Sequence, residues 1–170
     1  MPSRSDDEGS GEHRPPDPDG NRRRRTQRVS QSIERLRTLR LGSTAEVCVA
    51  DDRLRRLYIS EEEVAIWRYG AEPQAGTARV RVDAAGARRL TADIEGLSIY
   101  EAGGSSGYLI ASSQESDRFT VFERGSYKYV MSFRVGTGRI DGVTHTDGID
   151  VTSRSLGRAF PRASSSHRTT

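Results

Sequence analysis

An internal repeat of about 50 residues constrains this chain more than any other feature. The segment 46–50 (EVCVA) aligns with 95–99 (EGLSI), 49 residues later, and with 147–151 (DGIDV), a further 52 residues along. The next segment repeats as well, because 57–60 (LYIS) matches 108–111 (YLIA), and Trp67 falls near Phe122. A repeat of this length that holds four short strands has the size of one β-propeller blade.

Short runs of β-branched and aromatic residues in period-two alternation predict nine strands and no long helix. The strands are expected at 46–50, 56–60, 64–69, 78–82, 95–101, 107–112, 118–123, 129–135 and 148–152. The segment 32–39 has weak helical periodicity, but it could equally form an arginine-rich outer strand. We therefore expect an all-β chain forming a partial β-propeller, with two complete four-stranded antiparallel blades, near 46–92 and 95–140, and part of a third. Closed propellers have about four to eight blades, so the chain reads as an interior piece of a larger propeller.

The two ends of the chain differ from this central region. Between Pro2 and Arg28 there is no aliphatic, aromatic, methionine or cysteine residue, so this stretch cannot fold by burial. After Pro161 the sequence shows no further strand pattern. We expect a disordered Arg/Pro/Asp-rich tail over 1–38, a propeller domain over 39–161 and a second disordered tail over 162–170.

Charge and composition exclude several classes of protein. The net charge of +3 arises within the first 40 residues, because residues 41–170 hold 17 basic and 17 acidic side chains. A neutral folded region gives no basic footprint for specific nucleic-acid binding, and the arginine run at 22–25 is expected to be a solvated tail.

No run approaches the about 18 apolar residues of a membrane span, and no secretory signal is visible. A single cysteine, Cys48, excludes an internal disulfide; we expect it to be a small buried hydrophobic side chain.

The repeat places a carboxylate at the same position three times. Glu46, Glu95 and Asp147 each open the first strand of a blade. First strands line the channel of a propeller, so the three side chains are expected to converge at one mouth of it. Two like charges about 4 Å apart repel by about 4 kcal/mol at an effective dielectric of about 20, so the cluster calls for a cation. All-oxygen coordination by carboxylates suits calcium.

Further motifs near these acids have simpler explanations. We expect Glu61 and Glu63 to be solvated turn residues, and His145 to be exposed rather than a metal ligand. The segment 103–107 (GGSSG) matches the pattern of a nucleophile elbow, but it joins two predicted strands and not a strand to a helix. We therefore expect a hairpin loop there.

Several stretches around the acids strongly resemble the β-propeller phytases, a family of bacterial calcium-dependent enzymes that remove phosphate from phytate, inositol hexakisphosphate. The stretches are 46–52 (EVCVADD), 57–62 (LYISEE), 66–69 (IWRY), 71–73 (AEP), 93–97 (DIEGL), 107–114 (GYLIASSQ) and 147–151 (DGIDV). They follow the family's order from about residue 39 to 161.

The resemblance implies a six-bladed family fold about twice this length, 3-phytase-type phosphatase activity, phytate or calcium phytate as substrate, and a secreted protein. It also implies a calcium-filled cleft at one end of the channel, lined by acids at the positions of Glu46, Glu62, Asp93, Glu95, Asp141 and Asp147. Glu62 is the candidate for orienting the attacking water. Val47 stands where the family usually has glycine; its side chain could crowd the cleft but leaves the neighbouring ligand Glu46 intact. The family's phosphate-gripping Lys, Arg and Tyr side chains find no match in the first 38 residues, so the substrate-binding residues stay open.

Three alternative functions remain. The chain could be a non-catalytic propeller fragment that keeps the family pattern. It could also be a calcium-dependent propeller of another class, such as a lactonase or a binding scaffold, or an arginine-rich nucleic-acid binder. The phytase-like stretches weigh against the second alternative and the neutral folded region against the third. Because the earlier blades find no match, we expect little phosphate release from the chain alone, and the oligomeric state stays open.

Overall fold

The computed structural model describes residues 34–169 apart from 87, 140 and 162–163. The chain divides into two units, Met1–Glu34 and Arg35–Thr170, and every described strand belongs to the second. The predicted tail over 1–38 lies largely outside the described residues, and 34–38 form neither helix nor strand. Over the part of the chain that is described, no helix is long and apolar enough to cross a membrane.

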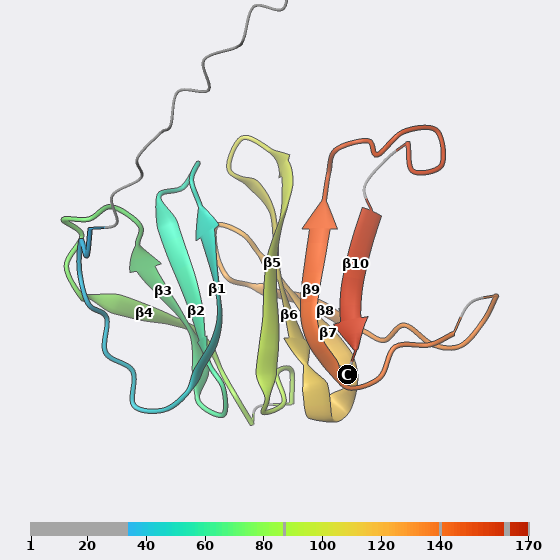
Figure 1. The fold of residues 1–170 in the computed structure, drawn as a ribbon, viewed down its shortest axis with the longest axis horizontal. Coiled ribbons are helices and arrows are strands. Elements are labelled where there is room, and N and C mark those ends of the chain that lie inside the picture. The colour runs from blue at the N-terminus through green and yellow to red at the C-terminus, as the bar shows by residue number, and fades with distance from the viewer. Residues whose placement is uncertain (1–33, 87, 140, 162–163, 170) are drawn as a thin grey trace, which may run out of the picture. The chain divides into compact units, whose positions relative to one another are not determined.

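Two four-stranded antiparallel sheets make up most of the second unit (Figure 1). Blade 1 consists of β1 (Ala45–Asp51), β2 (Arg56–Glu61), β3 (Ala65–Gly70) and β4 (Arg79–Ala84). Blade 2 consists of β5 (Ile94–Gly103), β6 (Ser106–Ser113), β7 (Arg118–Glu123) and β8 (Tyr129–Phe133), with a short 3-10 turn, η1 (Gln114–Ser116), after β6. Neighbouring strands pair in chain order within each sheet. The predicted all-β partial propeller with two complete blades is confirmed.

A third sheet begins with β9 (Thr146–Thr152), which pairs antiparallel with β10 (Ser164–Thr169). The sequence predicted a disordered tail over 162–170, whereas residues 164–169 form this strand. The segment has no apolar alternation to reveal it. Its pairing uses backbone N–H and C=O groups, which every residue of the segment carries whatever its side chain.

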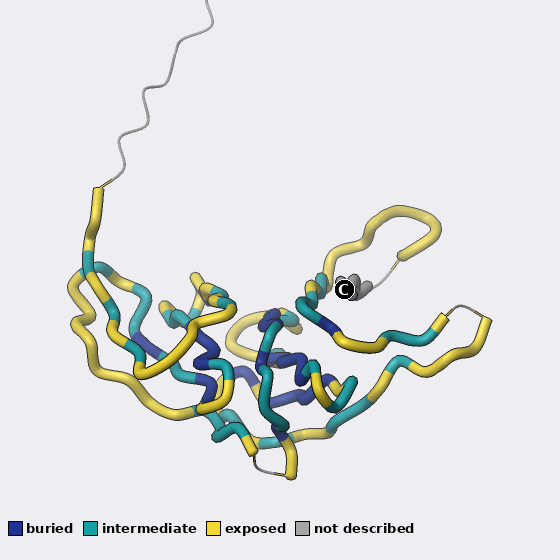
Figure 2. The backbone as a smooth tube through the Cα atoms, turned by 60° about the horizontal axis from the view of Figure 1, so that its bottom comes forward, coloured by how far each residue is buried: buried dark blue, intermediate teal, exposed yellow. Residues whose placement is uncertain are grey.

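The hydrophobic core lies between successive sheets, and β5 is in contact with both β1 and β9 (Figure 1). One cluster joins blades 1 and 2 and includes Tyr58, Ile66, Ile94, Leu97, Leu109 and Phe122. A second cluster covers the other face of blade 2 and packs Ile110, Phe119 and Val121 against residues that include Ile149 and Val151 of β9. Buried residues are concentrated in the strands, whereas most of the loops are exposed (Figure 2).

The second strands of the two blades correspond in a register one residue away from the sequence alignment. Val49 pairs with Tyr58 in blade 1, and its counterpart Ser98 pairs with Ile110 in blade 2. Tyr58 therefore corresponds to Ile110 and not to Leu109. Because successive side chains of a strand point to opposite faces, this single residue decides which side chains are equivalent.

The aromatic residues of the third strands follow the same register. Leu57 pairs with Tyr69 in blade 1, and Leu109 pairs with Phe122 in blade 2. Tyr69 is thus the counterpart of Phe122, and both are buried. The expected match between Trp67 and Phe122 was wrong by two residues.

Cys48 is exposed, contrary to the prediction. Its neighbours Val47 and Val49 pack against the core between the blades, so Cys48 points to the opposite face of blade 1. Its counterpart Leu97 is buried because blade 1 packs over it. Alternation identifies the two faces of a strand but does not tell which of them another sheet covers.

Candidate metal site

Each of the three first strands begins with a β-bulge. In β1, Ala45 pairs with Glu61 and Cys48 with Ile59, so β1 holds one residue more than β2 across this step. The step contains Glu46. A bulge bends the strand and changes the direction of the side chains at that point.

The same irregularity recurs in β5. Ile94 pairs with Ser113 and Gly96 with Ser112, so Glu95 is the extra, unpaired residue. Glu46 and Glu95 therefore share both a position in the repeat and a β-bulge, which sets the direction of the side chain.

The third bulge lies in β9. Thr146 pairs with Thr169 and Gly148 with Arg168, which leaves Asp147 as the extra residue. The repeat of acidic residues seen in the sequence is thus a repeat of acidic bulges in the fold.

Three carboxylates converge at this end of the strands. Glu46, Glu62 and Glu95 each offer an oxygen atom, and the three atoms lie within 4.8 Å of one another. Glu62 follows β2 and is held by its backbone: its N–H donates to the carbonyl of Thr44 at 3.2 Å, and its carbonyl accepts from the N–H of Ile94 at 3.3 Å. It therefore links the starts of β1 and β5, the two strands that carry the other acids.

Electrostatic repulsion at the site falls most clearly on Glu95. Its pKa is raised above the ordinary value, first by burial and then by the negative charges of Glu46, Asp147, Glu62 and Asp93. The same four acids that crowd Glu95 are candidate ligands from the sequence. A cation bound among them would relieve this repulsion.

Gln114 completes this arrangement, and the sequence reasoning missed it. Its side-chain Nε2 donates to Oδ1 of Asp147 at 2.6 Å. Its backbone N–H donates to the carbonyl of Asp93 at 2.9 Å, just as that of Glu62 donates to Thr44. Gln114 is therefore the blade 2 counterpart of Glu62, a correspondence that the sequence contains but that only the corrected register of the second strands reveals.

Three further residues from the sequence analysis are not among the three acids whose oxygens the structure groups together. Asp141 is exposed and is not among the charges that raise the pKa of Glu95. His145 is exposed, as predicted, and its backbone N–H donates to Asp117. The side chain of Val47 packs against the core between the blades, so it lies in the core and not among the acids.

Glu61 and Glu63 were both expected to be solvated. Glu63 is exposed, but the expectation is wrong for Glu61, which is 2% exposed. Its carboxylate accepts hydrogen bonds from Trp67 Nε1 at 2.6 Å and from the N–H groups of Gly42 and Ser43 at 2.6 and 3.0 Å. Burial raises the pKa of Glu61, but these hydrogen bonds more than offset that effect, so the pKa is lowered. Glu61 thus anchors the segment that leads into β1.

The loop at 103–107 is a hairpin, as predicted. β5 ends at Gly103 and β6 begins at Ser106. A nucleophile elbow needs a turn from a strand into a helix, which this loop does not provide.

The donor set of the cluster fits a hard cation. All three members are carboxylates. Among the described residues, no cysteine or histidine belongs to this group. Calcium accepts several carboxylate oxygens in irregular geometry, whereas zinc sites favour nitrogen and sulfur ligands. The residues present therefore suit calcium.

Comparison with known proteins agrees with this geometry. The phytase family model matches residues 29–165, a range that holds both blades and all six candidate ligands. A 3-phytase of Bacillus subtilis (strain 168) is 46% identical over 130 residues, which cover 75% of this chain and 34% of that protein. The matched region thus spans about a third of the length of this relative. The chain belongs to the phytase family.

Proposed function

We propose that this chain is part of a calcium-dependent 3-phytase that releases phosphate from phytate or calcium phytate. The observation that carries the proposal is the convergence of Glu46, Glu62 and Glu95 within 4.8 Å, in a chain of the phytase family. The 3-phytase activity named for the Bacillus relative supports the reaction class. Export from the cell, expected from the family, is part of the same proposal.

Six acids are the proposed calcium ligands: Glu46, Glu62, Asp93, Glu95, Asp141 and Asp147. Calcium held there would supply positive charge for the phosphate oxygens and would lower the pKa of a bound water. Within the chain, Glu46, Glu62 and Glu95 gather negative charge where β1 and β5 begin. Phytate and these acids are both anionic, so without the cation they repel one another.

Two side chains are proposed to orient the groups that take part in the reaction. Glu62 stands at the junction of β1 and β5 and is proposed to orient the attacking water by accepting a hydrogen bond from it. Gln114 holds one oxygen of Asp147 through its amide, which fixes the orientation of that carboxylate. Fixed carboxylates need no rearrangement when substrate arrives, and such positioning is a large part of catalysis.

A second candidate function is a calcium-binding propeller fragment without turnover. The matched region spans 34% of the Bacillus relative, and the site built from the described residues contains candidate metal ligands but no identified substrate-binding group. Only turnover separates the two candidates, since the chain binds calcium in both cases.

The test is phosphate release from calcium phytate by the chain alone and by a version extended with the remaining segments of the Bacillus relative. We expect little release from the chain alone, and chelator-sensitive release from the extended version. In the extended version, Glu62→Gln is expected to lower the rate by at least about a hundredfold, the usual contribution of a positioned acid or base. Glu63→Gln, at the exposed neighbour, is the matched control and is expected to keep the rate. Inactivity of the extended version, or equal rates of the two variants, would count against the proposal.

A further inference from the structure

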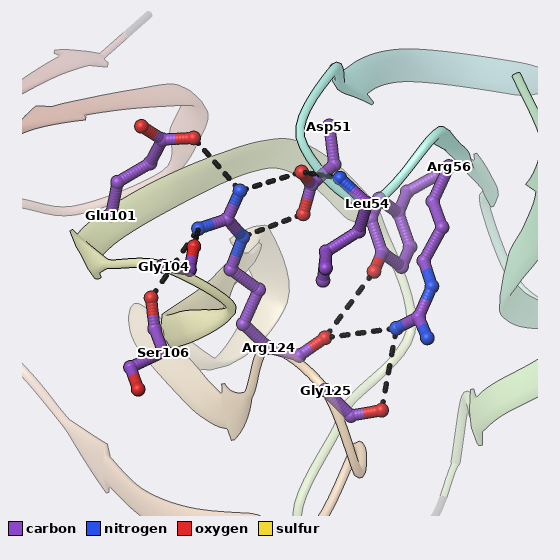
Figure 3. Close-up of polar contacts among 9 residues, drawn as sticks. Asp51, Leu54, Arg56, Glu101, Gly104, Ser106, Arg124 and Gly125 are labelled. Atoms are coloured by element: carbon purple, nitrogen blue, oxygen red, sulfur yellow. Dashed lines mark hydrogen bonds and ion pairs between the residues drawn. The ribbon is translucent and has the colours of Figure 1, made fainter.

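Arg124, which follows β7 in blade 2, is a fully buried side chain. Its Nε and Nη2 each lie 2.6 Å from an oxygen of Asp51, the last residue of β1 in blade 1 (Figure 3). Both side chains are 0% exposed. The pair is bidentate and joins residues 73 positions apart in the chain.

Further contacts fix Arg124 within its own blade. Its Nη2 lies 2.8 Å from Oε1 of Glu101, near the end of β5, and its Nη1 donates to the carbonyls of Gly104 and Ser106 at 3.4 and 3.3 Å (Figure 3). The planar guanidinium therefore holds Asp51 in a fixed direction relative to the hairpin between β5 and β6.

Blade 1 also reaches the backbone at this point. Nη1 of Arg56 donates to the carbonyls of Arg124 and Gly125, both at 3.3 Å, and the hydroxyl of Tyr58 donates to the carbonyl of Arg124 at 3.5 Å. Arg124 is thus the centre of the polar contacts that join the two blades at this end.

The position of this contact along the strands connects it to the metal site. β1 carries Glu46 near its start and Asp51 at its end, and β5 carries Glu95 near its start and Glu101 near its end. The two strands belong to different sheets, so no hydrogen-bond ladder sets their separation along their length. At their starts, they are bridged by the backbone of Glu62, which bonds to Thr44 and Ile94. At the starts of the strands, next to the metal site, Glu46 and Glu95 repel each other. At the opposite ends, Arg124 attracts one carboxylate from each strand, Asp51 and Glu101.

We infer that Arg124 is a positioning residue for the candidate metal site: it fixes the ends of β1 and β5 against each other and, together with the Glu62 bridge at their starts, sets the separation of Glu46 and Glu95. About five residues of strand, or roughly 16 Å, separate the two ends, which exceeds the screening length in physiological salt. The influence is therefore mechanical and runs through the strands. A buried ion pair is often no more stabilising than apolar residues of the same volume, so fixed geometry explains Arg124 better than stability does.

The test uses two ways of breaking the link without leaving a buried charge unpaired. Asp51→Asn keeps the shape of the side chain but removes its charge and replaces one acceptor oxygen with an NH2 donor, so the bidentate pair is lost, while Arg124 retains Glu101 as its counter-ion. Asp51→Leu combined with Arg124→Met replaces the whole pair with apolar groups of similar volume, which such sites tolerate. Glu123→Gln is the control, because Glu123 is exposed and bonds to Ser126 in its own loop. All proteins are compared at 4 °C after circular dichroism has shown that they are folded.

The first measurement needs no metal. Spin labels at Ala45 and Ala92, in a Cys48→Ser background, report the separation of the starts of β1 and β5 by dipolar broadening in EPR. We expect a longer and broader separation in both link-breaking variants, and the wild-type value in the control. Wild-type separations in all variants would overturn the inference, whatever happens to thermal stability.

The second measurement rests on the proposed function and uses calcium itself. Calorimetric titration is expected to show about tenfold weaker binding in the link-breaking variants, the usual cost of losing a residue that orients ligands. Europium luminescence lifetimes in the same site should show additional bound water. A merely structural role would lower the melting temperature and leave both readouts unchanged at 4 °C. If the wild-type protein binds no calcium, the proposed function fails, while the spin-label result still decides the role of Arg124.

Discussion

Glu95 shows how a single residue can link the site to the stability of the chain. Burial and four neighbouring acids raise its pKa, so the folded state holds its proton more tightly than the unfolded state does. As the pH rises through the ordinary range of a glutamate, the unfolded chain loses this proton first, and folding becomes less favourable. The negative charge that is proposed to bind a cation therefore destabilises the metal-free fold.

Glu95→Gln is expected to raise the free energy of unfolding of the metal-free protein at pH 7, because it removes this charge. The gain should vanish near about pH 3, where a glutamate is protonated in both states. Urea denaturation with a chelator present measures it. Glu115→Gln, at an exposed glutamate of η1, provides the comparison. A gain of the same size at both pH values, or a loss at pH 7, would show that the buried and repelled charge of Glu95 is not its cause.

At the scale of elements, the close approach of β5 to β9 depends on Gly96. A Cβ atom placed there would lie 2.8 Å from the backbone N of Ile149, 2.9 Å from Cα of Gly148 and 2.7 Å from Oγ of Ser112. The first two neighbours are backbone atoms, which cannot rotate away. In β1 the same repeat position holds Val47, whose side chain packs in the core between the blades.

Gly96→Ala is accordingly expected to destabilise the fold by about 1–3 kcal/mol, the usual cost of overpacking. Gly125→Ala is the matched control, since nothing lies within 4 Å of the Cβ that it would add. The control should change the free energy of unfolding by less than about 0.5 kcal/mol. Denaturant titration of the two variants decides the matter, and equal effects would mean that β9 can move away from β5 without cost.

For the molecule as a whole, calcium is expected to stabilise the folded chain, because Glu46, Glu62 and Glu95 are far apart in the sequence and come together only in the folded state. At a calcium concentration of about 100 times the dissociation constant, the added free energy of unfolding should be about 2.7 kcal/mol. Thermal unfolding measures this as a rise in melting temperature that a chelator reverses. Protons compete for the same carboxylates, so the rise should shrink at acidic pH.

Magnesium provides the comparison for this prediction. It prefers regular octahedral geometry and retains its waters, so its effect should be smaller than that of calcium. Glu46→Gln should reduce the calcium effect. An unchanged melting temperature in saturating calcium would contradict the metal site itself.

Much of this fold follows from local patterns in the sequence. All nine predicted strands occur, with ends that differ by no more than two residues, because period-two alternation is a property of neighbouring residues. The three first-strand acids could be identified for a similar reason: the repeat places Glu46, Glu95 and Asp147 at one position of successive blades, and the structure places all three at bulges.

The remaining features depend on contacts between distant parts of the chain. The burial of Glu61 and the exposure of Cys48 depend on which segments cover each face of blade 1. Gln114 could be recognised as the counterpart of Glu62 only after strand pairing had fixed the register. The contact between Arg124 and Asp51 spans 73 residues and leaves no periodic trace. A sequence specifies each strand through its neighbours, whereas cover, register and long-range charge pairing arise only when the sheets pack together.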